Sequence, residues 1–215
     1  NTIDKSYFHI DIFEGDSGYG EGSGATSQWV RTVQLYKRPS LALTHELTHL
    51  FTGCVGSQWN AEGFAEYVWS EVFPESFMQE GYPGYPSCDY RYILMNENHK
   101  HVDEHKRCIY AEEYFTRHGF VHNDMTTFDP VVWREGYAYA MIMENDGDLS
   151  KVIKETGAVD TSYEAYLCFT NYLIEKTSLA DYLKVLYDEA LFEEVFGADF
   201  ETLRAEWAEE LLSKY

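Results

Sequence analysis

Two segments near the N-terminus have the residue pattern of β-strands. Residues 7–13 read Tyr-Phe-His-Ile-Asp-Ile-Phe, so apolar and polar positions alternate along the segment. Residues 29–36 are rich in β-branched and aromatic side chains, and we interpret them as a second strand. The Gly- and Ser-rich stretch 15–24 between the two segments predicts a loop.

The apolar positions then change to helical spacing and predict a helix over about 41–53. Its expected buried stripe follows the spacing i, i+4, i+7, i+11 and consists of Leu43, Leu47, Leu50 and Cys54. His45 and His49 fall on a different face of this helix. We therefore expect both imidazoles to be presented at a site and not packed behind the core.

A second helix is predicted over about 61–73, with Asn60 as its N-cap. The apolar stripe of this helix consists of Phe64, Val68 and Val72. Gly63 lies inside the helix, where a glycine costs about 1 kcal/mol relative to alanine. Its presence suggests that another backbone approaches the helix closely at this point.

Beyond this helix the pattern is irregular as far as Pro130 and then helical to the end. The stretch 74–130 is aromatic and His-rich with several turn signals, and we interpret it as an insert. From Val131 onward helical spacing predominates. One helix is expected to begin with a capping box at 161–164, and another is expected after 197–199.

The order of these elements predicts an α+β fold with a small N-terminal sheet lobe and a larger C-terminal helical lobe. We expect one domain over 1–215, with the sheet and the first helix in 1–55 and a mainly helical part in 56–215. Asn1 is not an initiator Met, so we expect a processed chain that was trimmed from a longer one.

The formal net charge of −21 excludes whole classes of partner. Nucleic acid and anionic lipid would both be repelled by such an acidic protein. No apolar run approaches the 18 or so residues that a membrane span needs. The acidity is explained by solubility, or by an acidic cleft that accepts basic substrates.

The four cysteines contain no CxxC pair, which argues against a structural zinc site built from thiolates. Cys88 and Cys108 flank part of the insert and could close it as a disulfide, or both could be free thiols. The even number of cysteines is compatible with an exported protein.

The segment 45–49 reads His-Glu-Leu-Thr-His, an HExxH motif inside a predicted helix. Imidazoles at positions i and i+4 leave the same helix face, so His45 and His49 can share one Zn²⁺. Glu46 is then placed to act as the general base for a water activated by the metal.

A catalytic zinc takes three protein ligands and keeps one open position. Glu62 is the best candidate for the third ligand because it opens the next predicted helix. The alternative interpretation is that its negative charge only stabilises the N-terminus of that helix through the helix dipole. Glu66 follows one turn later and points the same way. It is a rival third ligand, a hydrogen-bond acceptor for the outer nitrogen of one His, or a solvated surface residue.

Together the segments 45–49 and 59–67 resemble the gluzincin metallopeptidases, whose aminopeptidase members carry HELxH followed by WLNEGFA. The resemblance implies a zincin-like fold with an active-site helix and zinc-dependent hydrolysis of peptide bonds. It also implies that Glu62 is the third zinc ligand and that Glu66 accepts a hydrogen bond from a zinc-binding His.

The same family carries a Tyr at the start of a later helix, where its hydroxyl stabilises the oxyanion of the reaction. The segments 162–166 and 172–176 are similar to that context, which implies this role for Tyr163. Since the chain has 18 Tyr, three others stay open as alternatives: Tyr137, Tyr139 and Tyr166.

This chain departs from the aminopeptidase pattern in three ways. The gap between His49 and Glu62 is shorter, the GAMEN motif that anchors a free amino terminus is absent, and the N-terminal lobe is short. These departures favour an endopeptidase, or a peptidase whose preference the motifs do not define. We expect a peptide or protein substrate that extends along an edge strand near 28–36. Family habit and the even cysteine count imply an extracellular or cell-surface location.

Other interpretations of the same residues stay open. The chain could be a catalytically silent gluzincin-fold module that binds protein or glycan at a surface, with the aromatic residues of 75–130 stacking on sugars. The segment 101–105 is an HxxEH, the inverted zinc motif, although its polar setting favours a solvated loop. His118 and His122 also have the spacing i, i+4 of two metal ligands, and a solvated loop is again the favoured interpretation.

Overall fold

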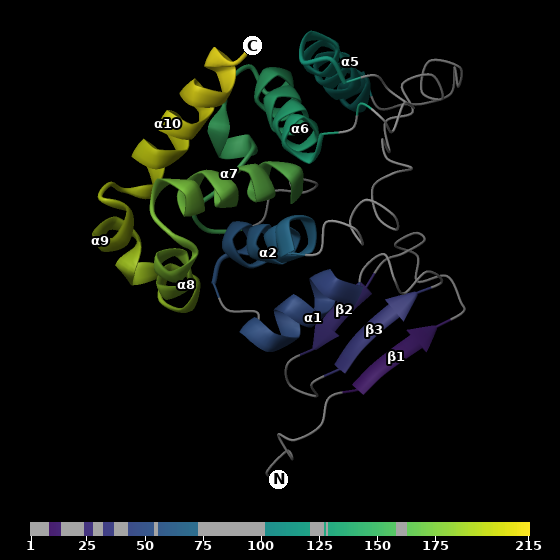
Figure 1. Ribbon diagram of the computed structural model, residues 1–215, viewed down its shortest axis with the longest axis vertical. Helices are drawn as coiled ribbons and strands as arrows, with labels where there is room; N and C mark the ends of the chain where they lie inside the picture. Colours follow the sequence, from purple (N-terminus) through teal and green to yellow (C-terminus); the bar gives the residue numbers. More distant parts are fainter. Residues whose placement is uncertain are drawn as a thin grey trace.

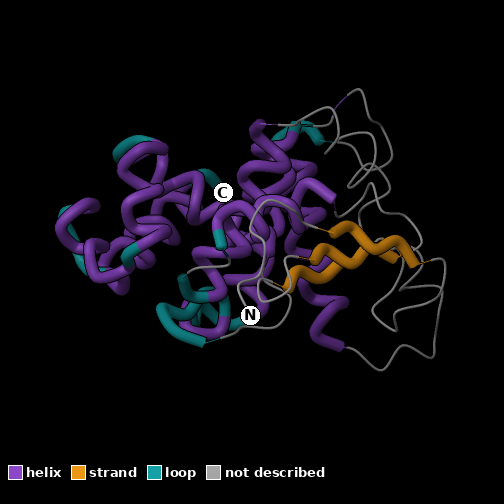
Figure 2. The backbone as a smooth tube through the Cα atoms, turned by 90° about the horizontal axis from the view of Figure 1, so that it is seen from below, coloured by secondary structure: helices purple, strands orange, loops and turns teal. Residues whose placement is uncertain are grey.

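The computed structural model describes residues 9–13, 24–27, 32–36, 43–53, 56–72, 102–120, 127, 129–157 and 163–215. Most of these residues are helical. Figure 1 shows a small sheet at one end of the molecule, with the helices α1, α2 and α7 stacked above it in that order. In the second view the strands again lie to one side of the helical body (Figure 2).

The sheet has three short strands, β1 (His9–Phe13), β2 (Gly24–Ser27) and β3 (Thr32–Tyr36), in the order β1-β3-β2. β1 runs parallel to β3, whereas β2 runs antiparallel to it. Val33 of β3 is fully buried. Of the predicted strand segments 7–13 and 29–36, the described parts 9–13 and 32–36 are confirmed by β1 and β3, but β2 was not predicted.

The predicted α+β class is wrong, because the described part of the chain is mostly helical. The strands contain only five, four and five residues, which is too little to form a sheet lobe of its own. The expected edge strand near 28–36 is also wrong. β3 is the central strand and is paired on both sides, so it has no free edge to which a substrate could add.

Helix α1 (Leu43–Thr52) confirms the helix predicted over 41–53. Leu50 is buried against Val33 of the sheet, and Leu43 and Leu47 pack against the same pair. The three leucines of the predicted stripe therefore form the face that holds α1 on the sheet. Cys54, the fourth residue of the stripe, lies outside the described residues. The opposite face of α1 is left for the next helix.

Helix α2 (Gln58–Tyr67) starts earlier than predicted, with Ser57 as its N-cap. Asn60 was expected to be the N-cap, and this is wrong. Asn60 lies in the first turn of the helix and is fully buried, and its side chain makes hydrogen bonds to residues of other elements. The helix does not continue in α form to residue 73, because a π-helical turn, η2 (Val68–Val72), follows it directly.

Helix α5 (Val102–Arg117) lies within the stretch 74–130 that was expected to be irregular, and the prediction is wrong for this part. Ala111, Tyr114 and Phe115 are buried at the spacing i, i+3, i+4 and hold α5 against α6. Because these positions are mostly aromatic among many polar residues, the apolar stripe is hard to recognise in the sequence.

The helical pattern predicted from Val131 onward is confirmed in the described residues. Asp129 caps α6 through Val131, and Asp199 caps α10 through Thr202, as the signal at 197–199 predicted. The capping box at 161–164 lies partly outside the described residues. The elements are α6 (Pro130–Glu144), η5 (Leu149–Lys151), α7 (Tyr163–Lys176), α8 (Leu179–Tyr187), η6 (Glu189–Leu191), α9 (Phe192–Phe196) and α10 (Phe200–Ser213).

The core between these helices is largely aromatic. Trp59, in the first turn of α2, is 2% exposed and its ring lies 5.4 Å from the rings of Phe169 and Phe200. Burying an aromatic side chain of this size contributes several kcal/mol, on the order of 25 cal/mol per Å² of apolar surface. The start of α2 is therefore anchored to α7 and α10 by packing.

Two sequence expectations concern residues that are only partly described. Cys168 is buried and free, whereas Cys54, Cys88 and the side chain of Cys108 lie outside the described residues. Both interpretations of Cys88 and Cys108, a disulfide or two free thiols, therefore stay open predictions. Among the helices that the structure describes, none has the length and apolarity to cross a bilayer.

Candidate metal centre

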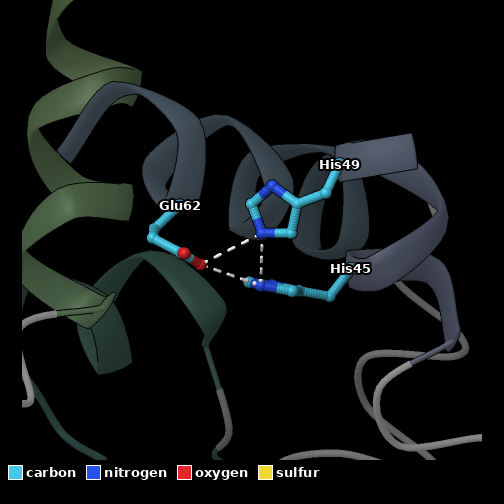
Figure 3. A group of neighbouring side chains, drawn as sticks. All are labelled: His45, His49 and Glu62. Atoms are coloured by element: carbon cyan, nitrogen blue, oxygen red, sulfur yellow. Dashed lines mark hydrogen bonds and ion pairs between the residues drawn. The ribbon is translucent and has the colours of Figure 1, made fainter. Parts of the chain in front are cut away.

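Three potential ligands from two neighbouring helices converge on one point (Figure 3). His45 and His49 come from α1 and Glu62 comes from α2. The two Nε2 atoms lie 3.0 Å apart, and Oε2 of Glu62 lies 3.0 Å from His45 Nε2 and 3.1 Å from His49 Nε2. The three atoms thus form a nearly equilateral triangle.

This triangle fits a tetrahedral metal ion. Ligand atoms about 2.0–2.1 Å from a tetrahedral centre lie about 3.3 Å from one another, close to the separations found here. Hydrogen bonds explain the arrangement less well. A proton between two of these atoms forms one hydrogen bond, but the third atom is then an acceptor that lies equally close without a proton of its own. The group His45, His49 and Glu62 could therefore hold a metal ion.

The close approach of α2 to the next layer fixes where Glu62 can lie. A Cβ on Gly63 would fall 2.8 Å from the carbonyl oxygen of Tyr166 and would also meet Oγ1 of Thr170. The backbone contact expected at this glycine is therefore confirmed, and the neighbouring backbone belongs to α7. Because α7 presses on one side of α2, Glu62 on another side is held toward α1.

Glu66 lies on the far side of the first imidazole. Its Oε1 is 2.9 Å from Nδ1 of His45, and its side chain is 6% exposed. Since Nδ1 faces Glu66 and Nε2 faces Glu62, the two carboxylates fix the orientation of the ring between them. The side chain of Glu66 thus touches the nitrogen that a metal at the triangle would leave unused.

The electrostatics of the cluster favour a positive charge at its centre. Burial alone would lower the pKa of His45, but the hydrogen bonds and negative charges of Glu62 and Glu66 raise it to about 10. Burial likewise opposes ionisation of Glu62, yet its contacts with His45 and His49 lower its pKa to about 2. A cation between these groups replaces the proton that His45 otherwise carries.

Tyr163 borders the same site as the first residue of α7. Its ring centre is 6.0 Å from that of His45, at an angle of 65°, and its side chain is 38% exposed. Burial and nearby negative charge raise the pKa of its hydroxyl. The charges come from Glu62, Glu66 and Glu46. Tyr163 therefore faces the candidate ligands and also the buried carboxylate of Glu46 on α1.

The three alternative tyrosines lie in the aromatic core. Tyr137 is 4% exposed beside Trp133, and Tyr139 is 2% exposed and stacks on Tyr215. Tyr166 is 1% exposed one turn beyond Tyr163. Of the four candidates, Tyr163 is thus the one with an exposed ring next to the histidine pair.

The other histidine motifs form no such group. In the described residues, His45, His49 and Glu62 are the group that could hold a metal. His118 stacks on Tyr114 and its Nδ1 lies 2.8 Å from the carbonyl oxygen of that residue. The described residues do not include His101, His122 or the side chain of His105. The HxxEH interpretation of 101–105 therefore stays a prediction.

Several polar residues near the site were not predicted to belong to its surroundings. Asn60, Tyr182 and Glu189 make hydrogen bonds behind α2, and Glu164 lies beside Tyr163 with a pKa raised to about 7, chiefly by burial. Asn60 offered one signal, since it is a polar residue between aromatic and apolar neighbours. Its partners follow more than 120 positions later and carry no motif.

No protein-family model, curated protein or solved structure matches this chain. The resemblance to gluzincins therefore rests on the motif residues of the sequence.

Proposed function

We propose that this chain is a zinc-dependent metallopeptidase of the gluzincin type. The observation that carries the proposal is the triangle of His45 Nε2, His49 Nε2 and Glu62 Oε2, with sides of 3.0–3.1 Å. Glu46 is buried on the same helix, next to the first ligand. Two imidazoles and one carboxylate around an open position are the ligand set of catalytic zinc in peptidases.

A bound zinc ion supplies a Lewis acid that activates water and polarises the substrate carbonyl. Glu46 has the role of general base in this proposal. Its carboxylate takes a proton from the attacking water as the new carbon–oxygen bond forms. It then delivers the proton to the amide nitrogen as the carbon–nitrogen bond breaks. Glu46 thereby returns to its ionised form after each cycle.

Glu66 and Tyr163 support this reaction in two different ways. Glu66 holds the ring of His45 through Nδ1, 2.9 Å away, and so keeps Nε2 turned toward Glu62. The hydroxyl of Tyr163 is a hydrogen-bond donor for the oxyanion that develops on the substrate carbonyl. A tyrosine hydroxyl is protonated at neutral pH, as a donor must be, and the raised pKa of Tyr163 keeps it so at higher pH as well.

The test is digestion of a complex peptide library, read by mass spectrometry. The wild type is expected to cleave, to stop after chelation and to recover with zinc. Glu46→Gln is expected to bind zinc equally well and to lose at least about 10³-fold in kcat, because its amide cannot accept the proton. Glu194→Gln, on the exposed surface of α9, is the matched control and should cleave like the wild type.

The fragment ends would also separate endopeptidase from exopeptidase action. Cleavage by Glu46→Gln at the wild-type rate would contradict the proposed mechanism. Tight zinc binding by His45 and His49 without any cleavage would instead favour a module that binds its partner and does not hydrolyse it.

A further inference from the structure

A chain of buried polar side chains lies on the side of α2 that faces away from the histidine pair. Asn60 on α2, Thr170 on α7 and Tyr182 on α8 are each 0% exposed. Polar groups at such depth are normally retained only when they are hydrogen-bonded, because burying an unpaired one is unfavourable. Each of the three is in fact hydrogen-bonded to another.

Tyr182 is the centre of this chain. Its hydroxyl donates to Oδ1 of Asn60 over 2.7 Å and lies 3.2 Å from Oγ1 of Thr170. Tyr182 and Asn60 are 122 positions apart in the sequence. The contact therefore ties α2 to α8 by a directional bond, in addition to the apolar packing around it.

Glu189 of η6, an exposed residue, extends this buried chain to the surface at the N-terminus of α2. Its Oε1 accepts hydrogen bonds from the backbone N–H of Ser57 and from the Ser57 hydroxyl, both over 2.7 Å. The same oxygen accepts from Nδ2 of Asn60 over 3.1 Å. A carboxylate here also complements the positive end of the helix dipole. Glu189 thus binds the backbone N–H of the N-cap residue Ser57, as the Glu at the third helical position does in a capping box.

These bonds determine how far α2 can rotate about its own axis. Asn60 and Glu62 are two positions apart, about 200° around the helix, so they project from nearly opposite sides. A rotation of about 10° would move a group some 6 Å from the axis by about 1 Å. Catalytic and metal-binding groups tolerate about half of that displacement.

We propose that Asn60, Tyr182 and Glu189 are positioning residues that set the rotation of α2 and so place Glu62 against His45 and His49. Their bonds fix the rotation, while the close approach of α7 at Gly63 limits the distance between the helices. This inference rests on the proposed metal centre, because it concerns the geometry of one ligand of that centre.

The test compares Tyr182→Phe with the wild type in zinc affinity, measured by competition with a chromogenic chelator. Removing the hydroxyl leaves the ring in the core but takes away the donor to Oδ1 of Asn60, so Asn60 keeps only its bond to Glu189. The expected result is a zinc affinity about tenfold weaker, as for other residues that orient metal ligands. The visible absorption of bound Co²⁺ should change as well, since it reports the ligand geometry directly.

Tyr114→Phe is the matched control. Tyr114 is also 0% exposed, and its hydroxyl donates to Glu135 over 2.9 Å, but neither residue lies on a helix that carries a candidate ligand. This variant should lose thermal stability and keep both the zinc affinity and the Co²⁺ spectrum. Equal zinc affinity in the wild type, Tyr182→Phe and Tyr114→Phe would overturn the positioning role alone.

A double-mutant cycle with Glu62→Ala shows through which residue the effect acts. If Tyr182 acts through Glu62, then Tyr182→Phe should not weaken zinc binding further once Glu62 is removed. A full tenfold loss in the Glu62→Ala background would contradict the inference. Absence of zinc binding in the folded wild type would overturn both the proposed function and the positioning role, and so separates the two failures.

Discussion

At the scale of single residues, Tyr163 is the group whose role is easiest to separate from folding. Its ring is 38% exposed beside His45, so its hydroxyl can be removed without opening the core. Tyr163→Phe is expected to lower kcat about 10²-fold, the typical effect of losing one oxyanion donor, and to leave zinc affinity unchanged. Steady-state kinetics on a library-derived peptide would measure this; an unchanged kcat would exclude the oxyanion role.

Glu164, the next residue, gives the fold a pH dependence. Its pKa is raised to about 7, first by burial and further by the negative charge of Glu66. The folded state therefore holds a proton that the unfolded chain releases near pH 4.5, so this contribution to stability is fully present below pH 4.5 and is lost as the pH rises through 7.

Glu164→Gln removes this titration. Relative to the wild type, the variant should gain stability between pH 4.5 and 8, by about 3 kcal/mol at most, since one pKa unit corresponds to 1.36 kcal/mol. Urea unfolding of both proteins at pH 4.5, 6 and 8 would measure the difference. A difference that stays constant with pH would show that Glu164 is not the titrating group.

At the scale of elements, the contact between α2 and α7 determines whether the site assembles. Gly63→Ala would place a methyl group against the carbonyl of Tyr166, and overpacking of this kind costs about 1–3 kcal/mol. The two helices must separate to accept the methyl group, so zinc affinity is expected to fall together with the unfolding temperature.

Gly136→Ala is the control for this prediction. Its added Cβ would meet the ring of Phe115, between α6 and α5, and no candidate ligand lies on those helices. It should lower the unfolding temperature and leave zinc affinity unchanged. If Gly63→Ala also destabilises without any change in zinc affinity, the α2–α7 contact supports the fold but not the site.

The elements also show where sequence patterns succeed. α1 was predictable because one face is a regular Leu stripe and another carries two His at i and i+4. Asn60 was misinterpreted because an Asn before a helical segment usually caps it. Here the helix begins earlier, after the N-cap Ser57, so Asn60 lies inside the helix and its side chain binds Tyr182 in the core. α5 was missed because its buried face is mainly aromatic within a polar, His-rich stretch.

At the scale of the whole molecule, zinc should stabilise the fold because it joins two layers. Its ligands come from α1, which lies on the sheet, and from α2, which lies under α7 (Figure 1). With free zinc at 100 times its dissociation constant, linkage predicts about 2.7 kcal/mol of added stability. For a chain of this size, that raises the unfolding temperature by about 5–10 °C.

Scanning calorimetry of the chelated and the zinc-loaded protein would measure this shift, with Glu62→Ala as the control that should show a smaller one. Equal unfolding temperatures for the wild type with and without zinc would contradict a bridging metal. The comparison requires the same pH in both samples, since His45 must release its proton before it can bind a metal.

The fold class was less predictable than the site. Two strands were located correctly, but three strands of four or five residues do not make a sheet lobe, and strand order is not encoded in local patterns. The three potential ligands lie within 17 positions of one another and meet across one short connection, so local reasoning reached them. The polar residues behind α2 depend on contacts over more than 120 positions.

This separation has a consequence for the order of events during synthesis. All three potential ligands leave the ribosome before Tyr182 and Glu189, which are made about 120 residues later. At about 5–20 residues per second, the growing chain carries its ligands for several seconds before α8 and η6 exist. The nascent chain should therefore bind zinc weakly, and firm retention of the metal should begin only when the C-terminal helices dock.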